Sequence, residues 1–319
     1  MLARQLPKLR PLLSRPPVYS VRWHHSQFTA TQLGGPVGTP THRMYFEHSQ
    51  QPISPWHDIP LSSSPGTYNM VVEVPRWSNA KLEIDTSSPF NPITQDTKNG
   101  KLRFVANVFP YKGYIWNYGA LPQTFEDPNH VDQDTGCVGD GDPVDVVEIG
   151  QNVCAQGSVQ SVKVLGVLAL IDGGETDWKV LAIRADDPLA PQMHSIEDVR
   201  RLMPGLVEAT VDWFTNYKVP DAKPTNPWAF GGQPKDAKYA ERVIAETHNA
   251  WRRLMDSPEP SKFALANTTV GSSRWTLEPS KAAEELKALA AAIPANAGPV
   301  QTPSQKWHFV RNGVITNTE

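Results

Sequence analysis

Two apolar segments separated by a short glycine turn limit the folds that this chain can adopt. Residues 162–171 have the composition of one long strand, and residues 178–183 have that of a second. The sequence Asp172-Gly173-Gly174 ends the first segment, and the second follows almost at once. The pair therefore predicts a β-hairpin, which in turn indicates a fold built largely of strands.

Four shorter segments have the β-branched or alternating patterns of further strands. They are residues 70–74, 81–84, 103–105 and 144–149. Several short strands at this spacing along a chain indicate a small barrel.

Two helices are expected after the strands. The first spans about residues 195–217, with Ser195 as its N-cap and a break at Pro204-Gly205. The second spans about residues 236–255, where apolar side chains recur at helical spacing. The fold class that we expect is α+β and mainly β, a small closed five-stranded (OB-like) barrel with flanking helices and extra strands.

The sequence Asp140-Gly141-Asp142-Pro143-Val144-Asp145 holds three carboxylates within a short span. Such acids repel one another unless cations lie among their oxygens, and Mg²⁺ prefers oxygen ligands. In an extended segment Asp140 and Asp142 would point to the same side, and Asp145 would begin the next strand. An EF-hand loop starting at Asp140 or Asp132 is excluded, because neither start places the required glycine correctly. The remaining alternative is a solvated acidic turn.

A second acidic pair and a group of cations and tyrosines extend this pattern. The hairpin turn would hold Asp172 and Asp177 close together, although alone they would fit an ordinary turn. Lysine and arginine bind phosphate, and tyrosine hydroxyls donate to phosphate oxygens. Together with the carboxylates, these side chains describe a site for a small polyanion held by Mg²⁺. The members of this group are Lys81, Glu83, Arg103, Tyr114, Tyr118, Tyr217 and Lys218.

Two other functions fit part of this pattern. A non-catalytic Ca²⁺- or Mg²⁺-binding module would explain the aspartates but not Lys81, Arg103 and Tyr217-Lys218. A nucleotide phosphohydrolase would need a base-recognition element, and the sequence has no Walker loop and no dinucleotide fingerprint. The net charge of −3 gives no general attraction to nucleic acid, and no apolar run reaches the length of a membrane span.

Taken together, the motifs resemble those of soluble family I inorganic pyrophosphatases of the fungal and animal type. Residues 140–145 match the signature of that family, and further blocks are similar in the same order within about residues 29–257. These blocks are residues 69–77, 113–119, 174–179 and 217–220. The resemblance implies hydrolysis of inorganic pyrophosphate to two orthophosphates by in-line attack of a metal-activated water. It also implies three to four Mg²⁺ ions in each active site.

The resemblance assigns most of the acids to metal binding. Asp140, Asp145 and Asp177 would hold a tightly bound Mg²⁺, with Asp145 bridging to a second ion. Asp172, again with Asp177, would bind ions that arrive with the substrate. The remaining acids of this kind are Glu83, which would bind another ion, and Glu73, which would act through metal-bound waters.

The resemblance also implies roles for the other side chains. Asp142 would be the general base that orients the attacking water. The side chains that would hold the two phosphoryl groups are Arg103, Lys81, Tyr118, Tyr217 and Lys218, with Tyr114 and Lys179 nearby.

The two ends of the chain differ from its middle. Residues before Glu47 include several arginines and no acid, and leucines recur there at nearly helical spacing. This composition is typical of a mitochondrial transit peptide, here residues 1–28, although a disordered basic tail is the alternative. Residues 29–257 would be the pyrophosphatase domain, and residues 258–319 a C-terminal extension with one short helix. Both ends make the chain similar to the mitochondrial branch of the family.

Two further expectations concern assembly and redox state. The resemblance implies a homodimer, with exposed aromatic side chains as its contact. Cys137 and Cys154 are the only cysteines, so no cysteine-based zinc site is possible. They could pair, but we expect two reduced thiols.

Overall fold

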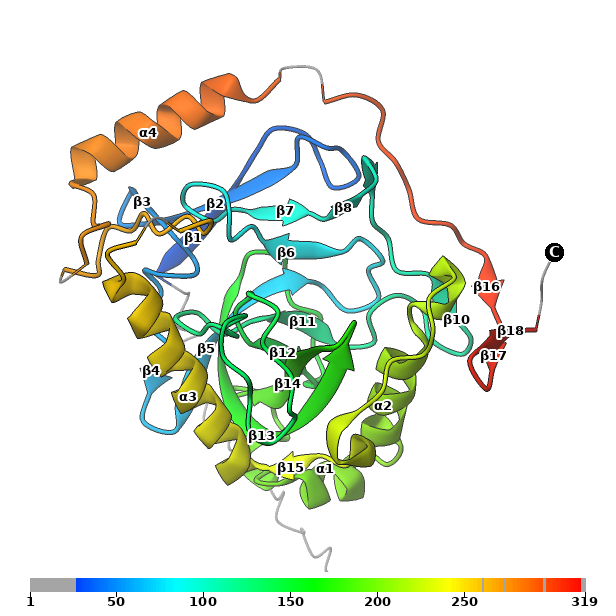
Figure 1. The fold of residues 1–319 in the computed structure, drawn as a ribbon. Helices are drawn as coiled ribbons and strands as arrows, with labels where there is room; N and C mark the ends of the chain where they lie inside the picture. The colour runs from blue at the N-terminus through cyan, green and yellow to red at the C-terminus, as the bar shows by residue number, and fades with distance from the viewer. Residues whose placement is uncertain (1–26, 260, 272, 295–296, 317–319) are drawn as a thin grey trace, which may run out of the picture.

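The computed structural model of the protein describes residues 27–259, 261–271, 273–294 and 297–316. The fold is mainly β, with a few helices around the strands (Figure 1). The leader predicted at residues 1–28 lies outside the described residues except for its last two. None of the helices in the described ranges has the length and apolar content needed to cross a membrane.

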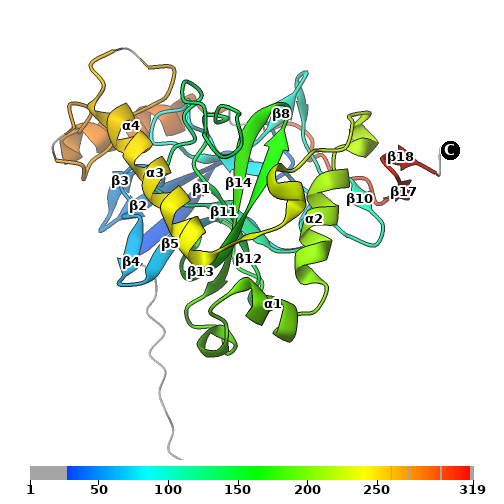
Figure 2. The ribbon, with the colours of Figure 1, turned by 60° about the horizontal axis from the view of Figure 1, so that its bottom comes forward.

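A seven-stranded sheet lies at the centre of the molecule (Figures 1 and 2). Its order is β15 (Lys235–Asp236), β13 (Val159–Asp172), β14 (Glu175–Arg184), β12 (Asp145–Glu148), β11 (Asn117–Ala120), β5 (Thr67–Val74) and β4 (Ser62–Ser64). Strands β12 and β14 run parallel, and the other neighbours in this sheet run antiparallel. The first part of β13 also pairs with β5, so the pairings from β5 through β11, β12, β14 and β13 return to β5.

The hairpin predicted from the sequence is confirmed as β13 and β14. Asp172 pairs with Glu175 across the turn, and Gly173 and Gly174 between them have φ angles of +65° and +96°. Two positive φ angles are what a two-residue turn between twisted strands requires, and glycine adopts them without strain. The predicted strand at residues 70–74 is also confirmed, within β5, and residues 144–149 contain β12.

Both faces of the hairpin are buried, so it forms the centre of the core. Val167 and Val180 belong to one apolar cluster, which includes Val243 from helix α3 (Ala237–Asp256). Leu168 and Leu181 point the other way into a second cluster, which helix α2 (Leu206–Asn216) helps to form. Because both strands are packed on both faces, the turn that joins them at Asp172–Glu175 is held in a fixed position.

A second sheet packs next to the first. It contains β1 (Phe28–Leu33), β2 (Arg43–His48), β7 (Ile93–Gln95) and β6 (Leu82–Ile84) in that order, and β3 (Gln51–Ile53) pairs with β2. The strand predicted at residues 81–84 is confirmed as β6, in which Leu82 and Ile84 are buried while Lys81 and Glu83 are partly exposed. Three short ribbons complete the strands: β8 (Thr97–Lys98) with β9 (Lys101–Leu102), β10 (Asn107–Val108) with β16 (Trp307–His308), and β17 (Val310–Arg311) with β18 (Val314–Ile315).

The strand predicted at residues 103–105 is wrong. Phe104 forms only an isolated bridge with Ala80. The reason is that the backbone of Arg103 bonds to two different segments: its N–H donates to Asp96 (2.8 Å), and its carbonyl accepts from Lys81 (3.1 Å). This irregular path brings the Arg103 side chain next to β6.

Four helices surround the strands in the described residues, and the predicted ones are confirmed. They are α1 (Ile196–Leu202), α2 (Leu206–Asn216), α3 (Ala237–Asp256) and α4 (Pro279–Ala292), and single 3₁₀ turns occupy Ala190–Gln192, Val219–Asp221 and Ala229–Gly232. The Ser195 hydroxyl accepts a hydrogen bond from the Asp198 N–H (3.2 Å), which caps α1 as predicted. Gly205, with φ of +87°, separates α1 from α2.

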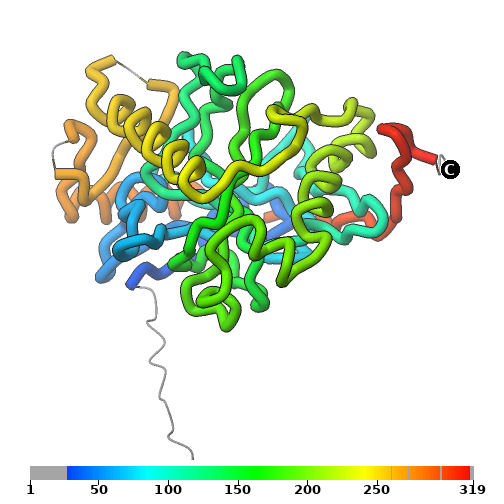
Figure 3. Tube along the Cα trace, turned by 90° about the horizontal axis from the view of Figure 1, so that it is seen from below, coloured from blue at the N-terminus to red at the C-terminus, as the bar shows by residue number. Residues whose placement is uncertain are grey.

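The C-terminal extension runs over the surface from α4 to the ribbon of β17 and β18 on the opposite side of the molecule (Figure 3). Near its start, the buried carboxylate of Asp58 accepts hydrogen bonds from the backbone N–H groups of Thr268 (2.8 Å) and Thr269 (2.7 Å). Ala282 of α4 packs against Tyr45 and Phe90. The extension thus attaches to the domain at several separate points. Both cysteines are free thiols.

Candidate active site

Every site residue predicted from the sequence lines one cavity of about 120 Å³. Strands β5, β6, β11, β12, β13 and β14 contribute to it, together with the C-terminal end of α2. Trp213 and Phe214 of α2 add apolar surface to the wall. The predicted residues that the cavity brings together are Glu73, Lys81, Glu83, Arg103, Tyr114, Tyr118, Asp140, Asp142, Asp145, Asp172, Asp177, Lys179, Tyr217 and Lys218.

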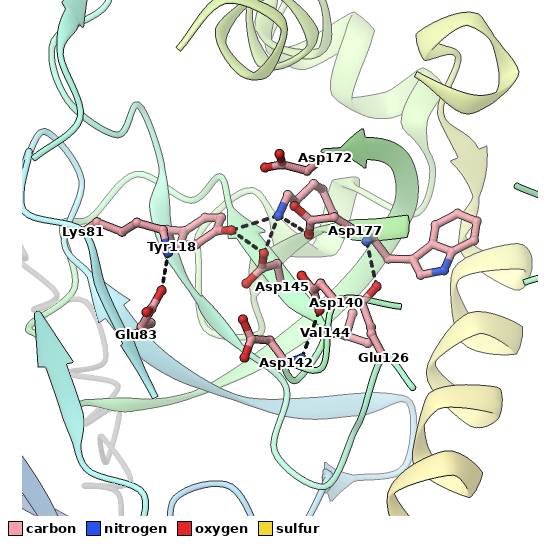
Figure 4. A network of polar contacts seen from close by, with 12 residues as sticks. Lys81, Glu83, Tyr118, Glu126, Asp140, Asp142, Val144, Asp145, Asp172 and Asp177 are labelled. Atoms are coloured by element: carbon pink, nitrogen blue, oxygen red, sulfur yellow. Dashed lines mark hydrogen bonds and ion pairs between the residues drawn. The ribbon is translucent and has the colours of Figure 1, made fainter. Parts of the chain in front are cut away.

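The hexapeptide at residues 140–145 forms a turn rather than the expected extended segment. The carboxylate of Asp140 accepts a hydrogen bond from the N–H of Asp142 (2.9 Å), and Gly141 between them has φ of +92°. Carboxylates of aspartate commonly bond in this way to the backbone two residues on. The turn still places Asp140, Asp142 and Asp145 around the same cavity, as Figure 4 shows.

Lys179 lies within the acidic cluster. Its side chain is 2% exposed, and its ammonium pairs with the carboxylates of Asp145 and Asp177. The same ammonium donates to the hydroxyl of Tyr118 (3.0 Å), which itself donates to Asp145. Strand register explains this meeting, because Asp145 of β12 and Lys179 of β14 are directly paired.

Three further ion pairs hold Lys81 and Arg103 in the cavity. Lys81 pairs with Glu83 and with Asp96 (3.2 Å), and Arg103 pairs with the same carboxylate of Asp96. Asp96 was not predicted as a site residue, and it fixes Lys81 and Arg103 side by side.

On the opposite wall, both oxygens of Asp172 accept from the ammonium of Lys218. The hydroxyl of Tyr217 also donates to Asp172 (3.0 Å). Because these residues follow α2 directly, the end of that helix positions the two predicted phosphate ligands beside the turn of the β13–β14 hairpin.

Glu126 is an acid of the cluster that the sequence did not reveal. One of its carboxylate oxygens accepts from the N–H of Trp178 (2.9 Å), and the other is buried without a hydrogen-bond partner. Carboxylate oxygens of Glu126, Asp140 and Asp177 lie within 4.8 Å of one another. Glu126 lies outside the signature at residues 140–145, so its position in the sequence gave no signal of a role in the site. Backbone hydrogen bonds from Glu126 to Asp142 and from Gly141 to Glu126 bring it to the acidic cluster.

These acids fit a hard divalent cation. Several carboxylate oxygens converge on one space, and one of them, on Glu126, lacks a hydrogen bond although it is buried. Buried carboxylates in this arrangement repel each other strongly unless a cation or a proton lies between them. The donor set, oxygen only, is the one that Mg²⁺ and similar ions prefer.

Burial and mutual repulsion raise the pKa values of the acids in this cavity. Burial, followed by the charge of Asp142, raises the pKa of Asp140 to about 7. The side chain of Asp142 faces the open part of the cavity, but protein surrounds it on its other sides. This burial, followed by the charge of Glu83, raises the pKa of Asp142 to about 7. Burial, with help from neighbouring acids, raises the pKa values of Glu73, Glu126 and Asp177 well above their ordinary range.

Lys179, which is buried, and Lys81, which is partly buried, remain charged. Burial lowers the pKa of Lys179, but the charges of Asp145 and Asp177 outweigh it and raise the pKa well above its usual value. Lys81 behaves in the same way, with Glu83 as the acid that raises its pKa most. The cavity therefore holds permanent cations among acids that compete for protons.

A larger cavity, of about 550 Å³, lies between α3 and residues 125–134. It includes Glu126 in its wall but none of the predicted site residues. The smaller cavity is the better candidate for catalysis, because it contains all the predicted site residues and several acids with raised pKa values.

The chain is similar in sequence to known proteins of one family. A model of a family described as inorganic pyrophosphatase matches residues 70–252. The inorganic pyrophosphatase of Homo sapiens is 52% identical over 90% of this chain and 100% of its own length. That of Candida glabrata is 48% identical over 89% of this chain and 98% of its own. This chain belongs to the inorganic pyrophosphatase family.

Solved structures agree with this assignment. The inorganic pyrophosphatase of Schistosoma japonicum superposes with a TM-score of 0.80 at 42% identity, covering 88% of this chain and 100% of that one. An N-terminally truncated vacuolar soluble pyrophosphatase of Trypanosoma cruzi, solved in complex with PPi, gives a TM-score of 0.66 at 38% identity, covering 78% and 98%. The predicted membership of the eukaryotic soluble family I inorganic pyrophosphatases is confirmed, and the chain is a hydrolase of inorganic pyrophosphate.

Divalent cations are expected to stabilise the fold more at high pH than at low pH. In the cation-free fold Asp140 and Asp142 have pKa values of about 7, whereas free aspartate has a value of about 4. Between about pH 4 and pH 7 the folded state binds more protons than the unfolded one, so its free energy of unfolding falls as pH rises through that window. A bound cation stabilises the ionised carboxylates and so offsets this loss in the free energy of unfolding.

Thermal unfolding with EDTA and with excess Mg²⁺ measures the effect. We expect the increase in Tm on adding Mg²⁺ to be at least about 5 °C at pH 8 and clearly smaller at pH 5.5. Asp140→Asn should reduce the increase at pH 8, whereas Glu284→Gln, on the exposed surface of α4, should leave it unchanged. Equal increases at both pH values would contradict the assignment of these acids to cation binding.

Proposed function

We propose that the hydrolysis of inorganic pyrophosphate to two orthophosphates requires Mg²⁺ and proceeds by in-line attack of a water activated by the bound ions. The observation that supports this proposal is the meeting of converging carboxylates with phosphate-binding cations in a single cavity. A metal-binding module would need the acids alone. The cations on the walls of the cavity would in addition provide ligands for an anion.

The acids divide by position into those that would hold ions directly and one that would not. Asp140 and Asp177 lie beside Glu126, which has an unpaired carboxylate oxygen, and Asp145 shares the ammonium of Lys179 with Asp177. Asp172 and Glu83 lie on opposite walls and would hold further ions, to give the three to four that we propose. Glu73 already accepts a hydrogen bond from the N–H of Ile84 (2.7 Å), so it would act through water. Bound there, Mg²⁺ would supply charge neutralisation of the phosphoryl oxygens and acidification of water.

Asp142 is the residue that we propose as general base. It is the most exposed acid of the hexapeptide, and the turn fixes its backbone through Asp140 and Glu126. A base works best when its pKa lies near the working pH, and the surroundings of Asp142 raise its value in that direction. Asp142 would accept the proton of the attacking water.

The cations and tyrosines would hold the substrate and stabilise charge as the bond breaks. Arg103 and Lys81 approach from one wall, fixed by Asp96, and Lys218 and Tyr217 approach from the other. Charge-assisted hydrogen bonds from such groups strengthen as negative charge moves to the leaving phosphoryl oxygen. The remaining ligands that we propose are Tyr118, Lys179 and Tyr114, which lie between the two walls.

Asp142→Asn tests the proposed base. The amide cannot accept the proton, so kcat for release of orthophosphate from pyrophosphate with Mg²⁺ should fall by about 10²–10⁴-fold. The Mg²⁺-induced increase in Tm should persist, because the ligands remain. Asp256→Asn, an exposed acid at the end of α3, is the matched control and should keep wild-type kcat. An Asp142→Asn enzyme with more than about a tenth of wild-type kcat would rule out this role.

We also propose that the protein is a homodimer. Aromatic side chains exposed on its surface support this: Trp77 is 58% exposed, and Phe109 (54%) stacks on Phe309 (43%) with ring centroids 5.1 Å apart. Exposed apolar groups of this size often mark interfaces.

Sedimentation equilibrium should give twice the chain mass of 35.3 kDa, and Phe109→Asp should shift the mass toward the monomer if this patch is the contact. A wild-type monomer at micromolar concentration would contradict the proposal.

We further propose a mitochondrial location, with residues 1–28 as a removable transit peptide. The arginine-rich, acid-free composition before Glu47 supports it. A fluorescent protein fused after residue 28 should enter mitochondria, and replacing the leader arginines by glutamine should abolish import. A wild-type fusion that stays outside mitochondria would refute the location.

Finally, we propose that the central strands form the closed five-stranded (OB-like) barrel expected from the sequence. The pairing of β13 with both β14 and β5 supports this closure. An experimental structure in which β5 and β13 are separated would contradict it.

A further inference from the structure

A second cavity, of about 370 Å³, adjoins the active site. It shares Lys81, Arg103 and Tyr217 with the active-site cavity, so these three residues border both spaces. The ribbon of β8 and β9 forms much of the remaining lining, through Lys98 and Lys101. In Figure 1 this ribbon follows β7 at the edge of the second sheet. We call this second space the outer cavity.

The geometry of the ribbon places its two lysines together. Lys98 and Lys101 are directly paired in register, so their side chains lie on the same face. The turn between them, Asn99 and Gly100, has φ angles of +52° and +72°, which keeps the ribbon tight. Like charges directly opposite each other across two strands are unfavourable. An anion bound between them would relieve this repulsion.

The two lysines also differ from the cations of the active site in their pairing. Lys81 and Arg103 both pair with Asp96. By contrast, no hydrogen bond or ion pair of the Lys98 or Lys101 ammonium is found within the ranges that the structure describes. The outer cavity thus contains two cations that form no ion pair with an acid of the described residues.

The balance of charge around the outer cavity favours an anion. Its described lining includes four cations (Lys81, Lys98, Lys101 and Arg103), and Asp221 is the single acid among them. The active-site cavity, by contrast, is lined by many carboxylates, which repel an approaching anion. A cationic surface next to such a site raises the local concentration of anions and the rate of their association.

We propose that the outer cavity is a phosphate-binding site that captures inorganic pyrophosphate from solution before it enters the active-site cavity. The proposal rests on pyrophosphate hydrolysis at the inner cavity and adds a binding step to it. Lys98 and Lys101 bind the anion first. Arg103 and Lys81, which line both cavities, then bind the anion as it moves into the active-site cavity, so it does not have to cross a surface of carboxylates.

The double variant Lys98→Gln/Lys101→Gln tests this step, because it removes both charges and leaves the Asn99–Gly100 turn intact. The matched control is Lys281→Gln/Lys287→Gln, which removes the same charge from the exposed surface of α4. Initial rates of orthophosphate release are measured against pyrophosphate concentration at constant free Mg²⁺. At an ionic strength of about 20 mM, kcat/KM of the test variant should fall by about 3–10-fold, with kcat unchanged within about twofold.

Added salt provides the second readout. Because salt screens exposed charges, the loss in kcat/KM should shrink below about twofold at an ionic strength of about 300 mM. The control variant should match the wild type at both ionic strengths. The proposal is overturned if the test variant matches the wild type at low salt, if the control variant loses as much, or if the loss appears in kcat.

Direct binding separates the outer site from catalysis. Isothermal titration of orthophosphate into the cation-free protein at low ionic strength should detect a site in the wild type and in the α4 control that is missing from Lys98→Gln/Lys101→Gln. Equal binding by all three proteins would reject the outer site even if the wild type is an active enzyme. If the test variant alone loses the orthophosphate site, and the wild type does not hydrolyse pyrophosphate, the catalytic proposal is rejected and the outer site is kept.

Discussion

Repulsion among buried carboxylates is the constraint on which the rest of this structure depends. The fold places more acids in one small cavity than protein alone can neutralise, and it offsets part of their charge with lysines built into the same wall. Lys179 is the clearest case, since it is almost completely buried and pairs with Asp145 and Asp177. The parallel pairing of β12 with β14 sets these groups opposite each other. The register of the central sheet is therefore also what assembles the site.

Much of this arrangement could be predicted from local sequence patterns. The hairpin, the break at Pro204-Gly205 and the signature at residues 140–145 each depend on neighbours in the sequence, where turn and capping preferences act directly. The family resemblance then brought distant residues into one site, and the cavity contains all of them. Asp142 in particular lies where the resemblance implied, although the turn around it was not expected.

What the sequence missed arises from contacts between segments with no local signal. Glu126 reaches the cluster through backbone hydrogen bonds to the signature turn, and Asp96 acts through the side chains of Lys81 and Arg103. Neither residue has a distinctive spacing to its partners. The incorrect strand at residues 103–105 has the same origin, because β-branched and aromatic composition cannot reveal that a backbone divides its hydrogen bonds between two segments. Contacts between segments distant in the sequence decided the positions of Glu126 and Asp96 and the path of residues 103–105.

The C-terminal extension is linked to the active site through one buried amide side chain. The oxygen of Asn107 accepts from the N–H of Gly113 (3.1 Å) and from Asn79 (2.8 Å), and its nitrogen donates to the carbonyl of Ser304 (3.3 Å). Asn79 and Gly113 directly precede the segments that carry Lys81 and Tyr114. Because an unpaired buried amide is costly, these three segments are held in place together.

The position of Lys179 has a consequence for how the ligands of this enzyme influence one another. A divalent ion held by Asp145 and Asp177, as proposed above, would compete with the ammonium for the same oxygens, and the ammonium would remain next to the hydroxyl of Tyr118. There it would be available to a phosphoryl oxygen. Metal and substrate would then cooperate heterotropically through one displaced side chain. Because such coupling is reciprocal, bound pyrophosphate would raise the affinity for the metal by the same factor.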